Sequence, residues 1–402
     1  MAARELKRAG KRVSVLEASN RLGGRVMTLY NTNAGVPVEL GAEFIHGDAP
    51  ETMRLLDEAR LVTVPVTGKH YRSDRGELTS QGDVWSRIAR VLGHMNPNRK
   101  SDRSFQEFLD DKPGGARLKD ERELARGFVQ GFFAADTRLI SEKSLAAEGA
   151  TGGAAEAKRI VNGYGALIDY LQRDIAGDIR VNVTVKRVIH SEADVRVIDN
   201  ANNEYRARAV VITVPLPMLQ NGSIDIEPEL PTLRRAASQL VMGTVTRVDV
   251  VVKERFWEKK VDDVAFVHSP KRPFNVWWTQ HPLHAPLITG WAGGPPAVEL
   301  SQTGDIEGAA IEELAAVFDM HRKRMEALVD SIYTHDWTHD PFTRGAYSYA
   351  GVGGSYASRV LARSFGRLLL AGEATDSGSS GTVEGALATG KRAARKVLAQ
   401  LS

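Results

Sequence analysis

The feature that most constrains the fold is a short strand near the start of the chain that ends on a carboxylate. Residues 12–16 alternate with β-branched side chains and predict a buried strand, and Glu17 follows it directly, ahead of a glycine turn. A carboxylate in that place is suited to accept hydrogen bonds from both hydroxyls of a nucleotide ribose. Glu17 is therefore a candidate ribose ligand, and the alternative is a solvated surface glutamate.

A dinucleotide site normally places this carboxylate about 20 residues after a G-x-G-x-x-G loop. Counting back from Glu17 runs past Met1. Residues 2–9 predict the end of an amphipathic helix that Gly10 stops, so the chain opens in the second half of a βαβ unit. We therefore expect the first strand and the phosphate loop to lie upstream of Met1.

The turn after Glu17 adds further candidates for the same site. Gly23 and Gly24 would let the backbone approach a planar or phosphate group closely. Arg25 offers a forked donor that suits a pyrophosphate. The alternative is an ordinary glycine turn with a surface arginine.

The far end of the chain supplies a complementary element. Residues 368–370 predict a buried strand, a loop rich in Gly and Ser follows, and a helix begins near Thr382. Free N–H groups at such a helix start bind anions or electron-rich carbonyls, and the helix dipole favours a reduced ring that carries negative charge. Glu373, after Gly372, lies at the strand end, where it could bind a polyol. Two such elements, each with a strand-end glutamate, favour one large cofactor.

The 402 residues suffice for two domains or one large interleaved domain. The pattern from 50 to about 147 is mostly helical, strands follow from 179 to 215, and a second, antiparallel sheet is expected from 240–252, 264–268, 274–279 and 286–291. Residues 305–333 predict a helical pair. Trp277 and Trp278 are expected in the sheet core, with a place on the substrate cavity as the alternative.

Composition excludes several classes of site and partner. The chain has no cysteine, which excludes disulfides, thiolate metal sites and a cofactor attached through cysteine. A net charge of +3 without a basic run does not indicate nucleic acid, and no apolar run approaches the roughly 20 residues of a membrane span. The scattered histidines lack a metal-binding pattern, so we expect no metal. We expect a cytoplasmic protein.

Five stretches carry a resemblance to a known family. They are "VSVLEASNRLGGRV", "VELGAEFIHG", "VVITVPLPMLQNGSIDIEPELP", "DPFTRGAYSY" and "LLLAGEATDSGSSGTVEGALATGKRAARKVL". In this order, over nearly the whole chain, they resemble the flavin-containing amine oxidases, which include monoamine oxidases, polyamine oxidases and histone demethylases of this type.

The resemblance implies an α/β fold with a Rossmann-like FAD-binding domain built from separated segments and an inserted α+β substrate domain of helices plus a mixed sheet. The FAD-binding domain would comprise 1–47, 154–220 and 341–402, without its first strand and glycine loop. The substrate domain would comprise 48–153 and 221–340.

The resemblance also assigns cofactor contacts. It implies that Glu17 binds the adenosine ribose, that Arg25 lies near the FAD phosphates and that the backbone of Val185 holds the adenine edge. It places Glu373 between the ribityl chain and the pyrophosphate, and Thr382 and Val383 under the flavin pyrimidine carbonyls.

On the substrate side, His46 matches an active-site position of polyamine oxidases, with a structural loop histidine as the alternative. Tyr347 matches one wall of the monoamine oxidase aromatic cage, but the opposite wall aligns with Thr382. Ala346 stands where monoamine oxidases carry the cysteine that bonds the flavin, so FAD is expected to be non-covalent. Arg247 stands where the family usually has a lysine that holds a water near flavin N5; the alternative is a surface ion pair with Asp249.

The resemblance therefore implies an FAD-dependent oxidoreductase that oxidises a small-molecule amine to an imine, with reoxidation by oxygen to give hydrogen peroxide. His46 and Tyr347 would orient the amine, and Arg247 would act at N5. Two alternatives stay open: a flavin-dependent desaturase or dehydrogenase acting on a C–C bond, and a truncated, inactive remnant.

Overall fold

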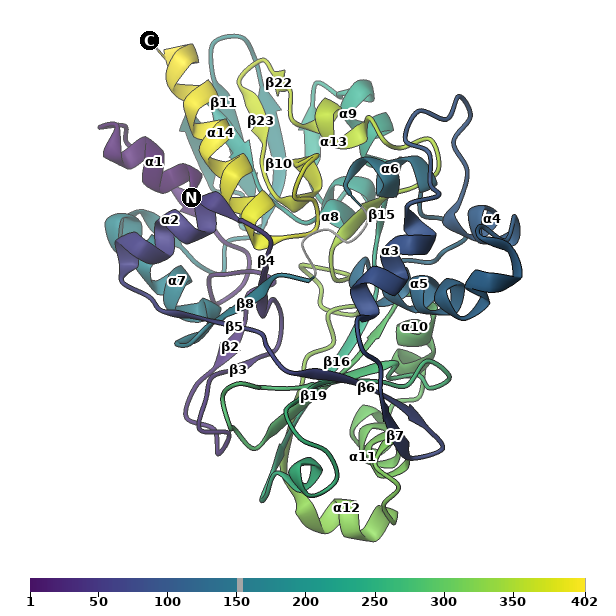
Figure 1. Cartoon of the computed structure of the whole chain (residues 1–402). Helices are drawn as coiled ribbons and strands as arrows, with labels where there is room; N and C mark the ends of the chain where they lie inside the picture. The colour runs from purple at the N-terminus through teal and green to yellow at the C-terminus, as the bar shows by residue number, and fades with distance from the viewer. Residues whose placement is uncertain (150–154, 402) are drawn as a thin grey trace.

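The computed structural model describes residues 1–149 and 155–401. The described chain forms one large sheet, a group of helices beside that sheet, and a set of smaller sheets to which both ends of the chain contribute (Figure 1). No helix of the described part is long and apolar enough to cross a membrane.

The large sheet has seven strands in the order β20-β16-β19-β18-β17-β6-β7. Only the pair β17 and β6 is parallel, and the other neighbours are antiparallel. The bounds of its strands are β6 (Lys69–Asp74), β7 (Glu77–Ser80), β16 (Val245–Val252), β17 (Val264–His268), β18 (Val276–Thr279), β19 (Leu287–Gly293) and β20 (Val329–Thr334).

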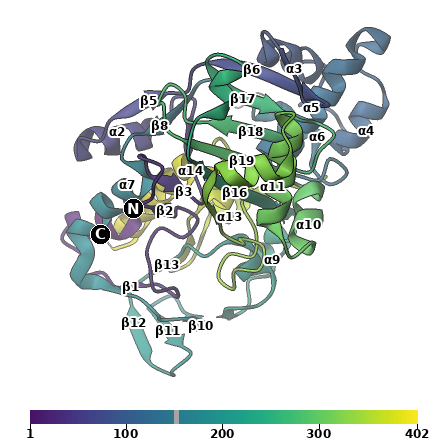
Figure 2. The ribbon, with the colours of Figure 1, turned by 90° about the horizontal axis from the view of Figure 1, so that it is seen from below.

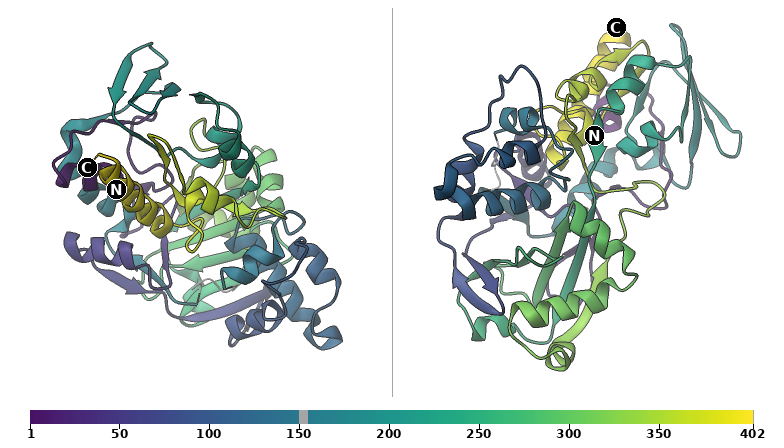
Figure 3. Two further views of the ribbon diagram at one scale, coloured as in Figure 1. Left: turned by 90° about the horizontal axis from the view of Figure 1, so that it is seen from above. Right: turned by 90° about the vertical axis from the view of Figure 1, so that its right-hand side faces the viewer.

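The two faces of this sheet have different neighbours. One face packs on helices α10 (Pro295–Gln302), α11 (Ile306–Val317) and α12 (Arg322–Leu328), which lie together against it (Figure 3). Successive strand residues point to opposite faces. Val248, Val250 and the fully buried Trp277 therefore join the helices, whereas Arg247 and Trp278 face a cavity. Trp277 is a core residue, as expected, and Trp278 takes the alternative place on the cavity.

The helical group corrects one expectation from the sequence. Residues 50–147 contain α2 (Pro50–Ala59), α3 (Val84–Leu92), α4 (Phe105–Asp110), α5 (Lys119–Phe132) and α6 (Glu142–Ala147), but strands β5 (Thr63–Pro65), β6 and β7 interrupt them. The two-residue turn between β6 and β7 is Arg75–Gly76, and both residues have positive φ, 53° and 86°. That backbone matches the twist of a hairpin, so the segment forms strands and extends the large sheet.

The smaller sheets lie on the other side of the molecule, where the hairpins of β10, β11 and β12 project away from the large sheet (Figure 2). The central sheet has the order β13-β23-β22, and the others are β12-β11-β10-β14, β1-β9, β2-β3, β4-β8-β5 and β15-β21. Their strands are β1 (Val15–Leu16), β2 (Thr28–Leu29), β3 (Val38–Glu39), β4 (Phe44–His46), β8 (Ala157–Ile160), β9 (Ile179–Arg180), β10 (Val185–His190), β11 (Val195–Asp199), β12 (Glu204–Ala207), β13 (Val210–Ile212), β14 (Asp225–Glu227), β15 (Leu240–Met242), β21 (Ser348–Ala350), β22 (Ser364–Phe365) and β23 (Leu368–Leu370).

The remaining helices surround these sheets: α1 (Ala2–Arg8), α7 (Gly163–Gln172), α8 (Leu216–Gln220), α9 (Pro231–Ala237), α13 (Ala357–Leu361) and α14 (Val383–Leu401). Helix α1 lies beside α14, so the first and last helices are neighbours (Figures 1 and 3). The pairing of β13 with β23, which is parallel, similarly joins the middle of the chain to its far end.

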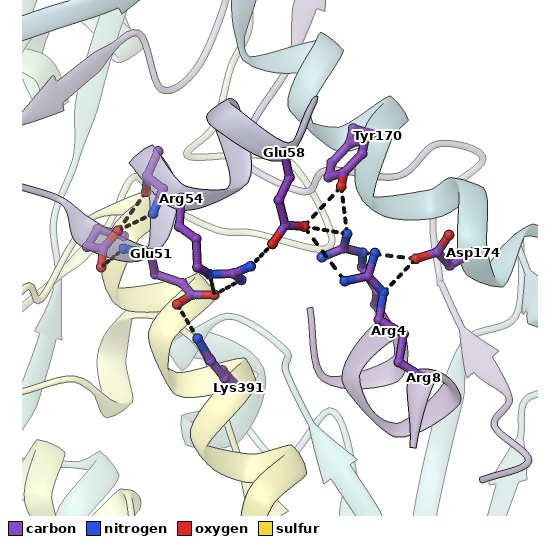
Figure 4. Close-up of polar contacts among 10 residues, drawn as sticks. Arg4, Arg8, Glu51, Arg54, Glu58, Tyr170, Asp174 and Lys391 are labelled. Atoms are coloured by element: carbon purple, nitrogen blue, oxygen red, sulfur yellow. Dashed lines mark hydrogen bonds and ion pairs between the residues drawn. The ribbon is translucent and has the colours of Figure 1, made fainter. Parts of the chain in front are cut away.

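Polar side chains tie the helices of this side together (Figure 4). The fully buried Arg4 of α1 donates to Glu58 of α2 at 2.9 Å and to Asp174 at 3.1 Å. Glu51 of α2 in turn accepts from Lys391 of α14 at 2.6 Å. The network fixes α1, α2 and α14 relative to one another; its labelled members are Arg4, Arg8, Glu51, Arg54, Glu58, Tyr170, Asp174 and Lys391.

The large sheet and the helices α2–α6 and α10–α12 fall within the predicted substrate segments, 48–153 and 221–340. Strand β14, which the sequence division also assigns there, pairs with β10 of the other part. The division into domains stays a prediction, and its boundary between 153 and 154 lies outside the described residues.

Candidate functional site

A cavity of about 1350 Å³ lies where the large sheet, the helical group and the smaller sheets meet. Pockets for one small molecule measure roughly 300–1,000 Å³, so this cavity has room for a large ligand and a second, smaller one. All the site residues predicted from the sequence line its wall: Glu17, Gly23, Gly24, Arg25, His46, Val185, Arg247, Tyr347, Gly372, Glu373, Thr382 and Val383. The fold thus gathers into one place residues from both ends and the middle of the chain.

An ion pair joins the two ends of the chain at this wall. Arg25 Nη1 donates to Glu373 Oε1 at 2.9 Å and to the carbonyl of Ala346 at 2.7 Å. The other oxygen of Glu373 accepts from Ser348 Oγ at 2.7 Å and from the backbone N–H groups of Ser348 and Gly381, both at 3.2 Å. The buried Glu373 is therefore fully occupied by protein donors and holds Arg25 in place. A direct contact of Glu373 with a ligand stays a prediction.

Glu17 is placed differently. One of its oxygens accepts from the backbone N–H of Ser19 at 2.8 Å, and the other has no hydrogen-bond partner among the described residues. Glu17 continues β1, and its N–H donates to the carbonyl of Arg180 at 2.9 Å, which fixes the backbone at the cavity wall. This carboxylate retains an acceptor for a ligand hydroxyl.

Two glycines leave space for a ligand at the same wall. Gly24 has φ +57° and Gly372 has φ +132°, and a Cβ added at either would meet no protein atom within 4 Å. A side chain there would occupy the cavity edge, so the bare backbone keeps the wall open to a large planar or phosphate-bearing group. The pattern fits a nucleotide cofactor.

Thr382 caps the last helix at the cavity. Its Oγ accepts from the N–H of Gly385 at 3.0 Å and donates to the carbonyl of Ser379 at 2.7 Å. The first N–H groups of α14, which begins at Val383, have no partner within the helix, and Thr382 and Val383 line the cavity. A helix of 19 residues presents a positive dipole end there, suited to an electron-rich carbonyl.

Arg247 lies at the centre of a buried charge network on β16. Its Nε and Nη2 both donate to Asp249 at 2.8 Å, and Nη2 also donates to Glu43 at 2.7 Å. Arg159 of β8 donates to the second oxygen of Glu43 at 2.6 Å. The two cations and two carboxylates balance, as burial requires. Asp249, the alternative partner that the sequence suggested for Arg247, does pair with it. The pair is buried, however, and does not lie at the sheet surface.

The network sets the ionisation of Glu43. Burial alone would raise the pKa of its carboxyl, but the charges of Arg247 and Arg159 outweigh burial and hold that pKa below the usual value. Glu43 also accepts from the indole N–H of Trp278 at 3.1 Å. The guanidinium of Arg247 lies on the cavity wall with most of its donors engaged, and an action at a flavin ring stays a prediction.

His46 and Tyr347 lie where ring side chains line the cavity. Burial lowers the pKa of His46 to about 4, and its Nδ1 is buried without a hydrogen-bond partner. Protein atoms cover this nitrogen, whereas Nε2 has no hydrogen-bond partner among the described residues and is the nitrogen of the neutral imidazole that a ligand in the cavity can reach. The Tyr347 hydroxyl donates to the carbonyl of Phe132 at 2.7 Å, so its ring, and not its hydroxyl, forms the wall.

Several residues of the site were not found from the sequence. They are the carboxylate and guanidinium partners in the network, Glu43 and Arg159, and the rings Phe44, His70, Trp85, Phe128, Phe132, Phe266 and His268. The one available signal was the alternation of β16, which predicts that Arg247 and Asp249 share a face. No local pattern links that face to Arg159 and Glu43, which lie about 90 and 200 residues away in the sequence.

The sequence profile of the flavin-containing amine oxidoreductase family matches residues 1–398. The chain is 29% identical to polyamine oxidase 2 of Arabidopsis thaliana, over 98% of this chain and 84% of that protein. It is 26% identical to lysine-specific histone demethylase 2 of Homo sapiens, over 99% of this chain but only 52% of the demethylase.

Solved structures share the fold. A putrescine oxidase with bound putrescine superposes with a TM-score of 0.84 at 20% identity, covering 99% of this chain and 96% of that one. A cyclohexylamine oxidase from Brevibacterium oxydans IH-35A also gives 0.84 at 20% identity, covering 100% and 96%. The predicted architecture of a Rossmann-like part with an inserted substrate part is confirmed by this likeness.

Replacing Arg247 by methionine should destabilise the protein by about 3–5 kcal/mol, because Asp249 and Glu43 would be left buried with too few cations. The measurement is urea unfolding followed by circular dichroism. Arg138→Met is the control, since Arg138 pairs with Asp136 at the exposed surface and its loss should leave the midpoint unchanged. Equal midpoints for the two variants would contradict the network's role.

Stability should fall as the pH drops from about 6.5 to about 4, in part because of His46. Its pKa is lowered from 6.5 to about 4 in the folded chain, so over this range the unfolded chain binds a proton there that the folded chain does not. His46→Phe should reduce the slope of unfolding free energy against pH by up to about 1.4 kcal/mol per pH unit. The control Tyr30→Phe, at an exposed position, should leave this slope unchanged. An unchanged slope in His46→Phe would refute the assignment of this pH dependence to His46.

Proposed function

The chain belongs to the flavin-containing amine oxidoreductase family, and on that premise we propose that it binds FAD non-covalently and oxidises a small amine to an imine. A bound flavin would supply the redox chemistry, the removal of a hydride equivalent from the carbon next to the amine nitrogen, with oxygen as the final electron acceptor and hydrogen peroxide as its product. The imine of a primary amine then hydrolyses in water to an aldehyde and ammonia. The family favours this reaction over desaturation of a C–C bond.

The observation that carries the proposal is that one cavity joins a nucleotide-type wall to a ring-lined chamber. Glu17, the glycines and the start of α14 line the nucleotide-type wall. His46, Tyr347 and Trp278 line the chamber. A cofactor that extends along the wall would reach the chamber with one end. The volume of about 1350 Å³ accommodates such a cofactor together with a substrate.

Different residues of the wall would bind different parts of FAD. Glu17 would accept from ribose hydroxyls, and Arg25, held by Glu373, would offer its remaining donors to a pyrophosphate. The backbone of Val185 at the start of β10 would hold the adenine. The helix end at Thr382 and Val383 would bind the pyrimidine carbonyls and favour negative charge there.

The residues of the chamber position the amine. His46 is neutral at pH 7, so its accessible Nε2, in the tautomer that carries the proton on the buried Nδ1, can accept a hydrogen bond from the amine N–H. Tyr347, anchored through its hydroxyl, presents its ring as a wall. Asp249 and Glu43 balance the charge of Arg247, so it would act at a flavin or a held water through the N–H that the network leaves unengaged, and it cannot shuttle a proton.

Any FAD bound to this protein should be released by acid or heat, because the chain has no cysteine and Ala346 stands at the usual attachment point. The measurement is flavin absorbance in the supernatant and the pellet after acid precipitation. The pellet should be colourless. A yellow pellet would mean a bond through another side chain and would refute non-covalent binding.

The full chain supplied with FAD and benzylamine in air should release hydrogen peroxide, ammonia and aldehyde in equal amounts. His46→Ala should lower kcat/KM roughly tenfold through the lost contact to the amine, and Arg138→Met, on the surface, should not. Peroxide assays with a range of amines provide the measurement. Bound flavin with no peroxide from any amine would contradict the proposed reaction.

A further inference from the structure

Ring side chains close a belt inside the cavity, with His46 at one end and His70 at the other. On one side the belt runs from His46 through Phe44 and Phe266 to His70, with successive ring centroids 5.8, 6.4 and 4.8 Å apart. These rings come from β4, β17 and β6, so strands form this side.

The other side of the belt runs from His46 through Phe132, Phe128 and Trp85 to His70. The successive centroid distances are 5.0, 5.0, 5.8 and 5.9 Å. Helices α5 and α3 supply these rings, and every ring of the belt lines the cavity. Two separate layers of the fold therefore converge on His70, and they enclose a chamber whose walls suit a flat, apolar body.

His70 is paired with a second histidine. His70 Nδ1 lies 3.0 Å from His268 Nε2, and the two ring planes are 14° apart with centroids 5.3 Å apart, as in an edge-to-edge hydrogen-bonded pair. One of these nitrogens donates and the other accepts. The two outer nitrogens, His70 Nε2 and His268 Nδ1, have no hydrogen-bond partner among the described residues, and both rings line the cavity.

The pair is neutral at pH 7. Burial lowers the pKa of His70 to about 4, against a smaller opposite effect of Asp83, and burial with the neighbouring His70 lowers the pKa of His268 to about 3. Whichever tautomer is present, a neutral pair with one internal hydrogen bond presents one outer donor and one outer acceptor. A hydroxyl group can both donate and accept, so it can pair with either outer nitrogen, whichever of the two the tautomer makes the donor or the acceptor.

Resting on the proposed amine oxidation, we propose that the belt binds the ring of an arylalkylamine and that the His70–His268 pair hydrogen-bonds a neutral hydroxyl at the far end of that ring. His46 then contacts the amine at one end of the belt, and His70 contacts the hydroxyl at the other. The two histidines act as specificity-determining residues at opposite ends of one substrate.

The competing occupant is the second ammonium of a diamine. Ring faces attract a cation by about 0.5–2 kcal/mol. An ammonium carries three donors, however, and the neutral pair offers a single acceptor, so the pair would leave two donors of the ammonium unpaired. The free-energy cost of leaving buried charged donors unpaired exceeds the attraction between the ammonium and the ring faces. Arg72 and the carboxyl groups of Glu123 and Glu148 also line the cavity, and none of them is joined to the pair by a hydrogen bond.

The test compares tyramine with phenethylamine, which differ only in the ring hydroxyl, in the full chain supplied with FAD. His70→Phe and His268→Phe keep the rings but remove the nitrogens. Each should lower the preference for tyramine about tenfold, the worth of one hydrogen bond, through KM and not kcat, and leave phenethylamine within twofold. His94→Phe, an exposed histidine, should leave the preference unchanged.

A second readout needs no turnover. Calorimetry with p-cresol and toluene, which carry no amine, should show p-cresol bound about tenfold more tightly, and His70→Phe should remove the difference. If p-cresol binds more tightly as expected but no amine is oxidised, the proposed reaction is wrong and the assignment of the belt and the histidine pair is supported. If amines are oxidised but the histidine variants keep the tyramine preference, or 1,4-diaminobutane outperforms tyramine, the belt assignment is overturned.

Discussion

The buried network of Arg247, Asp249, Glu43 and Arg159 is the constraint on which the rest of the site depends. Charges this deeply buried are tolerated only in pairs, so each guanidinium fixes the position of the carboxylates around it. The network joins β16 of the large sheet to the segment before β4 and to β8 of a separate sheet. It therefore sets the distance between two walls of the cavity, and with it the place of His46 at the end of β4.

A second ion pair closes the other half of the cavity. Arg25 and Glu373 come from opposite ends of the chain, and their contact holds the glycine turn near the start against the loop that leads into α14. Each half of the cavity thus depends on a charged contact between residues distant in sequence. Between these two fixed regions the wall consists of bare glycine backbone on the cofactor side and of rings on the substrate side.

The sequence predicted what is encoded locally. Strand-end carboxylates at Glu17 and Glu373, the helix start at Thr382 and the alternation that turns Arg247 and Asp249 to one face follow from short patterns. Short patterns did not predict the partners Glu43 and Arg159 or the pairing of His70 with His268, because only the completed sheets bring these residues together. The hairpin of β6 and β7 was missed because its turn, Arg75–Gly76, is not among the dipeptides typical of such turns.

The central claim is that this cavity lets an amine reduce a bound flavin. The direct measurement is the flavin absorbance of the FAD-loaded protein, mixed with tyramine in the absence of oxygen and then exposed to air. The absorbance near the visible maximum should be lost after tyramine is added and should return with air. A flavin that is bound, stays oxidised with every amine offered and yet is reduced by dithionite would contradict the account.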